Sequence, residues 1–429
     1  MRFQDLLPVR MIFAILTMTL GTVTSWAGSE TVLVNFDGSN GAIPYAGLIL
    51  DKAGNLYGTT NIGGIDNSGT VFKLSPSSSG WQETILHSFH RYGKDGSLPY
   101  ASLVMDEAGN LYGTTSAGGG HQNECGGGYP GCGTVFELSP TKQGWRETIL
   151  YNFPNAKNGL SPGYALALDK DGNLYSTTIF GGSDGGSDEC PSGCGVVFKI
   201  AHDSRGWHES VIYDFCSAQN CADGSNPDGP VIVDESGNLY GTASLGGNPS
   251  CSGGCGIVFR LRPFKGGWKE DVLYSFTGQK DGSFPYGGLV FDQAGNLYGI
   301  NSVDVHYGSG SIFELENSKG GWQLNILHNF GINDRGIEPN GSLTFDKDGR
   351  LYGTTSYGGV VGKLGNGLVF KLVHSGDGWK ENVVLALPAD GSGGSRPNAG
   401  VVLDSHGNVY GTAASAGGGG FGTVFEVPR

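Results

Sequence analysis

The residues that could carry out acid–base chemistry are few in this sequence. It has nine histidines but no His-Glu-x-x-His, no Gly-x-Ser-x-Gly and no P-loop motif. Most of the chain repeats a short pattern, and a catalytic group is expected where that pattern breaks. The stretch from Asn301 to His306 is such a break, so Asp304 and His306 are the candidate catalytic residues. The alternative is that His306 is an ordinary surface histidine.

The other histidines offer one candidate for ligand binding. His121 lies in a long glycine-rich loop, where it is either a binding residue or an ordinary surface residue. His87 and His328 instead occupy one equivalent position of the repeat, at which another copy carries Tyr151. This alternation with tyrosine predicts a half-buried strand position rather than a set of ligands.

Eight cysteines fall in four close pairs. An even number in an exported chain predicts disulfides, and pairing between neighbours is the simplest connectivity. The alternative is a zinc site made by the Cys-x-x-x-Cys loops, against which the export signal described below argues. The predicted disulfides either shape the rim of a binding site or protect long loops from proteolysis. The predicted pairs are Cys125–Cys132, Cys190–Cys194, Cys216–Cys221 and Cys251–Cys255.

Three tyrosines follow a proline at the end of a recurring Asp/Asn-Gly-x-x-Pro stretch. These stretches read first of all as turns that lead into the next repeat unit. Tyr45, Tyr100 and Tyr286 come directly after the proline. If the units surround an axis, these three side chains lie near it and are candidates for stacking on a sugar or another ring.

The elements that position these residues come from an internal repeat. Asp51 to Thr60 reads Asp-Lys-Ala-Gly-Asn-Leu-Tyr-Gly-Thr-Thr, and seven copies of this pattern start 54 to 65 residues apart. A fixed period of this size marks a repeat architecture. The Asp-x-x-Gly-Asn part predicts a tight turn. Asp169 and Asp346 begin versions that faintly resemble a calcium loop, but the further ligands are missing, so no metal or cofactor is predicted.

Each unit contains four short β-type runs. In the first unit they are residues 46–50, 55–60, 69–74 and 81–89. The first run is apolar and opens with small residues, as expected of the innermost strand. The last run begins at a Gly-Trp pair and mixes polar with apolar residues, as expected of an outer strand that is partly exposed to solvent. The recurring tryptophan is expected to pack between units.

The two ends of the chain complete one unit. The seventh unit stops after its third run, whereas residues 30–36 match the missing fourth run in pattern. This arrangement predicts an all-β, seven-bladed β-propeller with four-stranded blades, closed by the strand at about 30–36. Strand order then puts the links between blades and the loops between second and third strands on one face, which is the longer and more variable one. Any functional site is expected there.

Composition and the N-terminus indicate where the protein acts. The net charge is −14 and no basic cluster is visible, which argues against nucleic acid or an anionic membrane as partner. Residues 1–27 combine basic flanks, an apolar run and a small-residue cleavage site, so they predict a signal peptide followed by one domain, 28–429. A retained membrane anchor is the alternative. The mature protein is expected to be periplasmic, cell-surface or secreted, and monomeric.

Three motifs that recur in order resemble a known family. They are Gly-Asn-Leu-Tyr-Gly-Thr-Thr, Gly-Thr-Val-Phe-Lys-Leu and Gly-Trp-x-Glu-Thr-Ile-Leu, and together they cover nearly all of residues 30–429. They are similar to the GloVer-type, or choice-of-anchor, tandem repeat of exported bacterial proteins. This resemblance implies an exported, surface-associated propeller and brings no known reaction. We therefore expect a binding module for a glycan or a protein, with a lyase or hydrolase as the alternative.

Overall fold

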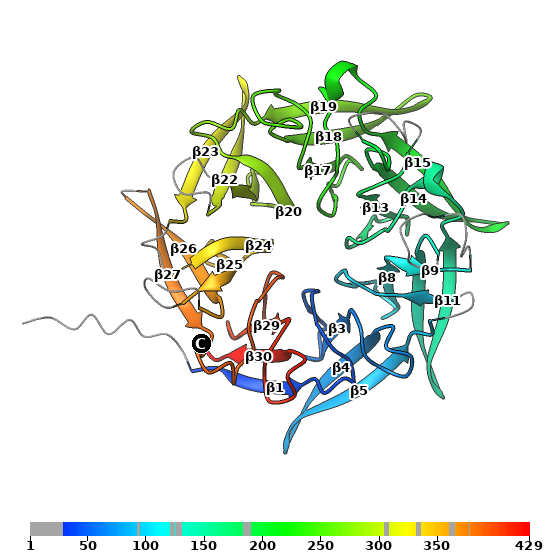
Figure 1. Ribbon diagram of the computed structural model, residues 1–429, viewed down its shortest axis with the longest axis vertical. Coiled ribbons are helices and arrows are strands. Elements are labelled where there is room, and N and C mark those ends of the chain that lie inside the picture. The colour runs from blue at the N-terminus through cyan, green and yellow to red at the C-terminus, as the bar shows by residue number, and fades with distance from the viewer. Residues whose placement is uncertain are drawn as a thin grey trace, which may run out of the picture.

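In the computed structural model, seven four-stranded antiparallel sheets stand around a central axis and close into a ring (Figure 1). The description covers residues 29–91, 95–120, 125, 131–182, 190–303, 309–331, 336–359, 365–376 and 378–429. The predicted signal peptide, 1–27, lies outside these residues. In the described part, the only helices are two short 3-10 turns, Ala156–Asn158 and Gln219–Cys221. The predicted all-β, seven-bladed propeller is confirmed.

Each blade is built from the same four strands, and blade 1 begins with β2. The innermost strands are β2 (Ile49–Leu50), β7 (Val104–Met105), β12 (Ala167–Leu168), β16 (Ile232–Val233), β20 (Ser283–Phe291), β24 (Gly336–Phe345) and β28 (Val402–Leu403). The second strands are β3 (Leu56–Thr60), β8 (Leu111–Thr115), β13 (Leu174–Thr178), β17 (Leu239–Ala243), β21 (Leu297–Val303), β25 (Leu351–Gly358) and β29 (Val409–Ala413).

The outer half of each blade is longer and more regular. The third strands are β4 (Thr70–Ser77), β10 (Thr134–Thr141), β14 (Val196–Asp203), β18 (Ile257–Phe264), β22 (Ser311–Ser318), β26 (Leu368–Ser375) and β30 (Thr423–Val427). The outermost strands are β5 (Gly80–Ser88), β11 (Gly144–Asn152), β15 (Gly206–Asp214), β19 (Gly267–Ser275), β23 (Gly321–Asn329), β27 (Gly378–Ala386) and β1 (Thr31–Asn35).

The ring closes through the first and last strands of the described chain. β1 pairs antiparallel with β30, with Thr31 opposite Glu426 and Asn35 opposite Thr423. The blue and red ribbons therefore lie in one sheet in Figure 1. This is the closure predicted from the incomplete seventh unit, and it leaves no blade with a missing outer strand.

The innermost strands are shorter than the sequence predicts in five blades. The run 46–50, predicted to be one strand, pairs with β3 only at Ile49 and Leu50. The backbone before them turns to the neighbouring blade: the carbonyl of Ala46 accepts a hydrogen bond from Oγ1 of Thr412, at 2.9 Å. Equivalent threonines donate to the inner runs of the following blades, as Thr59 does to Ala101. A threonine hydroxyl of the adjacent blade thus satisfies a backbone carbonyl that a neighbouring strand would otherwise satisfy.

The recurring aspartate turn is held by its own carboxylate. Oδ1 of Asp51 accepts hydrogen bonds from the backbone N–H groups of Ala53 and Asn55, at 2.9 and 2.8 Å. Oδ2 accepts from the Asn55 side chain at 2.7 Å and from the Tyr57 hydroxyl at 3.0 Å. With both oxygens engaged inside the turn, the structural interpretation is supported over a calcium loop. The same bonds recur at Asp106, Asp169, Asp234, Asp292 and Asp404.

The recurring tryptophan packs between blades, as predicted. Trp145 of blade 2 meets Tyr57 of blade 1 edge to face, with ring centroids 6.3 Å apart. This contact joins the start of an outer strand, where the Gly-Trp pair stands, to the second strand of the preceding blade. The equivalent pairs are Trp81–Tyr410, Trp207–Tyr112, Trp268–Tyr175, Trp322–Tyr240 and Trp379–Tyr298.

A clamp repeated at all seven junctions fixes the links between blades. Leu98, which precedes Pro99, has a φ of +58° and donates its N–H to the carbonyl of Ser68 in the preceding blade, at 2.9 Å. Gly69 follows Ser68 and packs so closely that an added Cβ would lie 2.4 Å from Cδ of Pro99. The residues equivalent to Leu98 are Ile43, Ser161, Asn226, Phe284, Glu338 and Arg396, all with positive φ and all donating in the same way.

The clamp brings the links and the variable loops to one face. Isolated backbone bridges join a link to the loop between the second and third strands of the same blade, as between Ala42 and Ile62. In blade 2 this contact is a small two-stranded sheet of β6 (Gly96–Ser97) and β9 (Ala117–Gly118). The face assignment drawn from strand order therefore agrees with the backbone contacts.

A polar seam lies between the outer strands of neighbouring blades. Each outer strand except β23 and β1 carries a glutamate that faces the preceding blade, and Glu30 directly precedes β1; the glutamates on the strands are Glu83, Glu147, Glu209, Glu270 and Glu381. Between blades 3 and 4, the hydroxyl of Tyr213 donates to Oδ2 of Asp223 at 2.8 Å. Burial, followed by the negative charge of Asp223, raises the pKa of Glu270 to about 7. The seams therefore hold carboxyl groups that resist ionisation.

We expect the clamp glycines to tolerate no side chain. In Gly310→Ala the new Cβ would lie 2.5 Å from Cδ of Pro339 at a φ of +93°. The matched control is Gly295→Ala, which has a φ of +85° and no atom within 4 Å. Both carry the cost of a left-handed alanine, about 1–2 kcal/mol. Overpacking adds roughly 1–3 kcal/mol in Gly310→Ala alone. Equal free energies of unfolding in urea for the two variants would contradict the clamp.

The seam acid predicts a pH dependence of stability. Because the folded-state pKa of Glu270 exceeds its usual 4.5, its protonated form is favoured in the fold, and the stability that it contributes is lost as the pH rises through about 7. Asp223, Asp271 and Tyr213 are the titratable groups that influence it. Glu270→Gln should therefore gain stability over the parent as the pH rises from about 5 to about 8. The control is Glu107→Gln, because Glu107 is exposed. Its stability relative to the parent should not change over this pH range. Thermal melts of all three proteins give the comparison.

Candidate functional site

A cavity of about 320 Å³ lies on the axis where all seven blades converge. The backbone of its wall comes from small residues at the start of the inner runs, such as Gly47, Gly163 and Gly341. Small residues are required because neighbouring runs touch: a Cβ on Gly341 would lie 2.4 Å from the backbone nitrogen of Gly400. The inner runs therefore pack tightly behind the cavity and leave larger side chains from the links to shape it.

Four tyrosines form one side of this axial pocket. Tyr45 and Tyr100, both predicted as binding residues, lie with ring centroids 4.9 Å apart and planes inclined by 38°. Tyr286, the third predicted residue, and Tyr164 complete the set. Burial and then neighbouring negative charge raise the pKa of Tyr164 well above 10, with Asp228 the main charged partner. The pKa values of Tyr100 and Tyr286 are raised chiefly by burial as well. These phenols remain protonated hydrogen-bond donors at neutral pH.

Asp228 stands behind the tyrosines and fixes one of them. Its Oδ1 accepts a hydrogen bond from the Tyr164 hydroxyl at 3.1 Å, and its Oδ2 accepts one from the hydroxyl of Ser244. Burial raises the pKa of Asp228, although these two hydrogen bonds act in the opposite direction. Asp228 is not among the lining residues, so its role is to position Tyr164.

Two amide side chains line the opposite arc of the pocket. Nδ2 of Asn340 donates to Oγ of Ser356 at 3.2 Å, and Ser356 donates to Oδ1 of Asn398 at 2.9 Å. The serine thus bridges the asparagines of blades 6 and 7 and holds them in register. The pocket is aromatic on one arc and carboxamide on the other.

These side chains share one position in the repeat, and the sequence analysis found only part of them. The residue directly after the link proline lines the pocket in six blades, and Asp228 of the remaining blade lies behind the pocket wall. Aligning all seven prolines rather than selecting aromatic residues would have found Asp228, Asn340 and Asn398, and Tyr164 one place further on. In chain order the seven positions are Tyr45, Tyr100, Gly163, Asp228, Tyr286, Asn340 and Asn398.

The predicted catalytic candidates are not part of the described site. Asp304, His306 and His121 lie outside the described residues. The predicted half-burial of His87 and His328 is confirmed, with side chains 19% and 18% exposed. His87 nevertheless lies close to two carboxylates from other segments, an arrangement that the sequence analysis did not foresee.

The cysteines form the four predicted local disulfides. Their Cα–Cα distances are 5.2 Å for Cys125–Cys132 and Cys190–Cys194, 4.0 Å for Cys216–Cys221 and 5.0 Å for Cys251–Cys255. The second and third disulfides are neighbours, with their four sulfurs within 4.8 Å of one another. Cys190–Cys194 lies within the long loop of blade 3 and Cys216–Cys221 lies within the link that follows it, so these two segments are in contact at their disulfides. Disulfides are compatible with an exported protein.

Fold and pocket together define a seven-bladed propeller of tandem repeats with a tyrosine-lined axial site. Models of the Gloeobacter/Verrucomicrobia repeat match residues 17–126, 124–361 and 250–429. The chain belongs to this repeat family, as its motifs predicted. No curated protein matches the chain. In the described part of the molecule, no helix combines the length and the apolar character needed to span a membrane.

Solved structures share the fold at low sequence identity. A candidate 6-phosphogluconolactonase from Bacteroides uniformis matches with a TM-score of 0.50 and 14% identity, over 84% of this chain and 88% of that one. The extracellular domain of a candidate hybrid two-component system from B. thetaiotaomicron matches with a TM-score of 0.54 and 12% identity, over 92% of this chain and 39% of that one. These similarities support the propeller fold alone.

The disulfides can be distinguished chemically from the zinc alternative. We expect the unreduced protein, denatured in the presence of a chelator, to expose no thiol to a thiol reagent, and reduction to release all eight. A zinc site at Cys190, Cys194, Cys216 and Cys221 would instead release four thiols on chelation, without reductant. That result would contradict the second and third disulfides.

Proposed function

We propose that this protein is an exported binding module whose axial pocket takes an uncharged carbohydrate. The observation that carries the proposal is the pairing of an aromatic arc, containing Tyr45, Tyr100 and Tyr286, with a carboxamide arc, containing Asn340 and Asn398. Sugars have an apolar face that stacks on aromatic rings and hydroxyls that exchange hydrogen bonds with amides and phenols. The two arcs supply both kinds of contact across one cavity.

The dimensions of the pocket support a small ligand or the terminal residues of a glycan chain. Its volume of about 320 Å³ stands at the lower end of the range of roughly 300–1,000 Å³ for small-molecule sites. Tyr100 is the most accessible tyrosine of the group, with 38% of its surface exposed, so a ligand that enters reaches its ring first. One or two sugar rings match this space better than an extended polymer.

The chemistry of the lining supports a neutral ligand. Among the described residues that line the pocket, none has an ionised side chain. A uronic acid or a phosphorylated sugar would therefore lose its hydration without gaining a charged partner. Asp228, which lies behind the wall, offers an anion no positive charge.

The same lining favours binding over acid–base catalysis, the alternative function. A lyase or hydrolase needs a group that exchanges protons near neutral pH. The described lining offers only tyrosines, and the raised pKa values of Tyr100, Tyr164 and Tyr286 keep these phenols protonated near neutral pH, so that they are not available as general bases. Asp228 is engaged with Tyr164 and Ser244.

A glycan array followed by calorimetry tests the proposal. We expect binding of neutral glycans, with Tyr100→Ala weakening the affinity up to about tenfold because an aromatic contact contributes roughly 0.5–1.5 kcal/mol. Asn398→Ala should weaken the same ligands by removing a hydrogen-bond partner. Both affinities are to be measured on protein whose melting temperature matches the parent.

The matched control is Ile65→Ala. Ile65 is 75% exposed and lies in a loop on the same face, away from the pocket lining. Its substitution should leave the affinity unchanged. Equal effects of Tyr100→Ala and Ile65→Ala, preference for acidic glycans, or turnover of a bound glycan would each contradict a neutral-sugar binding pocket.

A further inference from the structure

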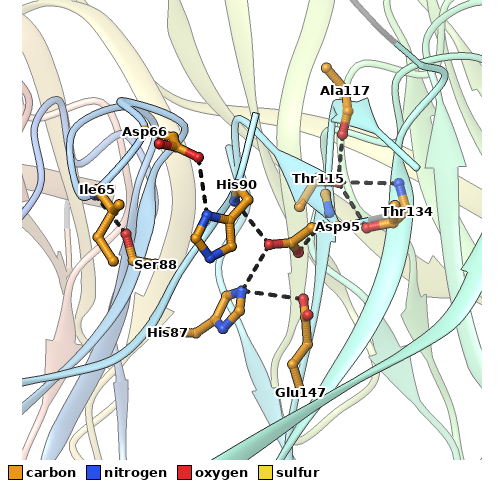
Figure 2. Close-up of polar contacts among 11 residues, drawn as sticks. Ile65, Asp66, His87, Ser88, His90, Asp95, Thr115, Ala117, Thr134 and Glu147 are labelled. Atoms are coloured by element: carbon orange, nitrogen blue, oxygen red, sulfur yellow. Dashed lines mark hydrogen bonds and ion pairs between the residues drawn. The ribbon is translucent and has the colours of Figure 1, made fainter. Parts of the chain in front are cut away.

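The seam between blades 1 and 2 combines an imidazole with two carboxyl groups. It brings together His87 at the end of β5, Asp95 in the link that follows, and Glu147 on β11 of the next blade (Figure 2). Nε2 of His87 lies 3.4 Å from Oδ2 of Asp95 and 3.5 Å from Oε1 of Glu147. The side chains are 19%, 13% and 17% exposed.

Two other seams contain a tyrosine where this one has His87, and the seam between blades 5 and 6 has His328, with Nε2 4.0 Å from Oε2 of Glu381. Between blades 2 and 3, the hydroxyl of Tyr151 and the amide of Asn158 both donate to Oε2 of Glu209, at 3.1 and 2.9 Å. Between blades 3 and 4, Tyr213 donates to Asp223. The tyrosine and asparagine supply protons that stabilise a buried carboxylate. Replacing both by His87 and Asp95 exchanges donors for groups that also bind metals.

In the seam of blades 1 and 2, two buried polar atoms face each other and Asp95. Nε2 of His87 and Oε1 of Glu147 are buried and make no hydrogen bond within the described residues. Burial and then the charge of Asp95 raise the pKa of Glu147 to about 9. Oδ2 of Asp95 accepts a hydrogen bond from the backbone N–H of His90 at 2.9 Å, and Oδ1 accepts one from Gly96 at 2.8 Å, so the carboxylate is held in place.

We propose that His87, Asp95 and Glu147 form a binding site for a divalent transition-metal cation that links blades 1 and 2. The expected cation is zinc. Zinc bonds of about 2.0–2.2 Å to nitrogen and oxygen at tetrahedral angles place ligand atoms roughly 3.3–3.5 Å apart. The two measured separations match this spacing. One potential ligand atom from each of the three residues lies within 4.8 Å of the others. A nitrogen ligand favours zinc over calcium or magnesium, which prefer oxygen alone.

The cation would remove the electrostatic problem of the seam. Two carboxylates and a neutral imidazole would surround a charge of +2, and His87 would bind through Nε2, which points toward both carboxylates in Figure 2. Since the ligands come from two blades, binding would stabilise the folded ring by mass action.

The test uses the purified, disulfide-intact chain without an affinity tag, stripped with chelator and dialysed against zinc chloride. We expect one zinc ion per chain, a higher melting temperature with zinc and no such increase with calcium or magnesium. His87→Tyr restores the residue type found at Tyr151 and Tyr213, so it should fold. It should weaken zinc binding by more than the roughly 10- to 100-fold that loss of an outer-shell partner costs.

The control is His90→Ala, because His90 is 52% exposed and contacts Asp66 rather than Glu147. It should bind zinc as the parent does. Cobalt gives an independent readout, since a tetrahedral site produces an absorption band that His87→Tyr should abolish. No bound zinc in the parent, undiminished binding by His87→Tyr, or equal loss in His90→Ala would overturn the proposal.

Discussion

The backbone clamp at each junction is the interaction on which the rest of the ring depends. The chain must cross from the outer strand of one blade to the inner run of the next, and the hydrogen bond from Leu98 to Ser68 fixes that path. Each left-handed residue costs about 1–2 kcal/mol, so seven junctions carry a strain comparable to the net stability of a protein. The packing of Gly69 on Pro99 and its six equivalents must offset it.

The clamp fixes a position without fixing the side chain that occupies it. It ends at the proline, and the next residue lines the axial pocket or, in the case of Asp228, lies directly behind its wall. Tyr45, Asp228 and Asn340 hold the same place in three blades and differ in every chemical respect. Selection for a ligand can therefore act on this position alone, because the backbone contacts that hold the blade lie before it. An asymmetric pocket on a nearly symmetric scaffold follows from this separation.

The sequence predicted features that recur and missed contacts between units. Blade number, closure and the role of Asp51 each rest on a motif seen several times, so errors in single residues did not matter. The length of the inner strands was wrong because Thr412 satisfies Ala46 from another blade. The meeting of His87 with Glu147 depends on how neighbouring blades are rotated against each other, and no local pattern encodes that rotation.

The pocket and the seam show two results of the same kind of substitution. In both places one position of the repeat carries different polar side chains in different blades. Asp228 accepts hydrogen bonds from Tyr164 and Ser244, so this carboxyl group lies behind the pocket wall and positions Tyr164. At His87 an imidazole takes the place of a tyrosine hydroxyl and faces the carboxyl groups of Asp95 and Glu147. A buried group of acceptors must be compensated by protons or by a cation. The fold tolerates either because the clamp lies elsewhere.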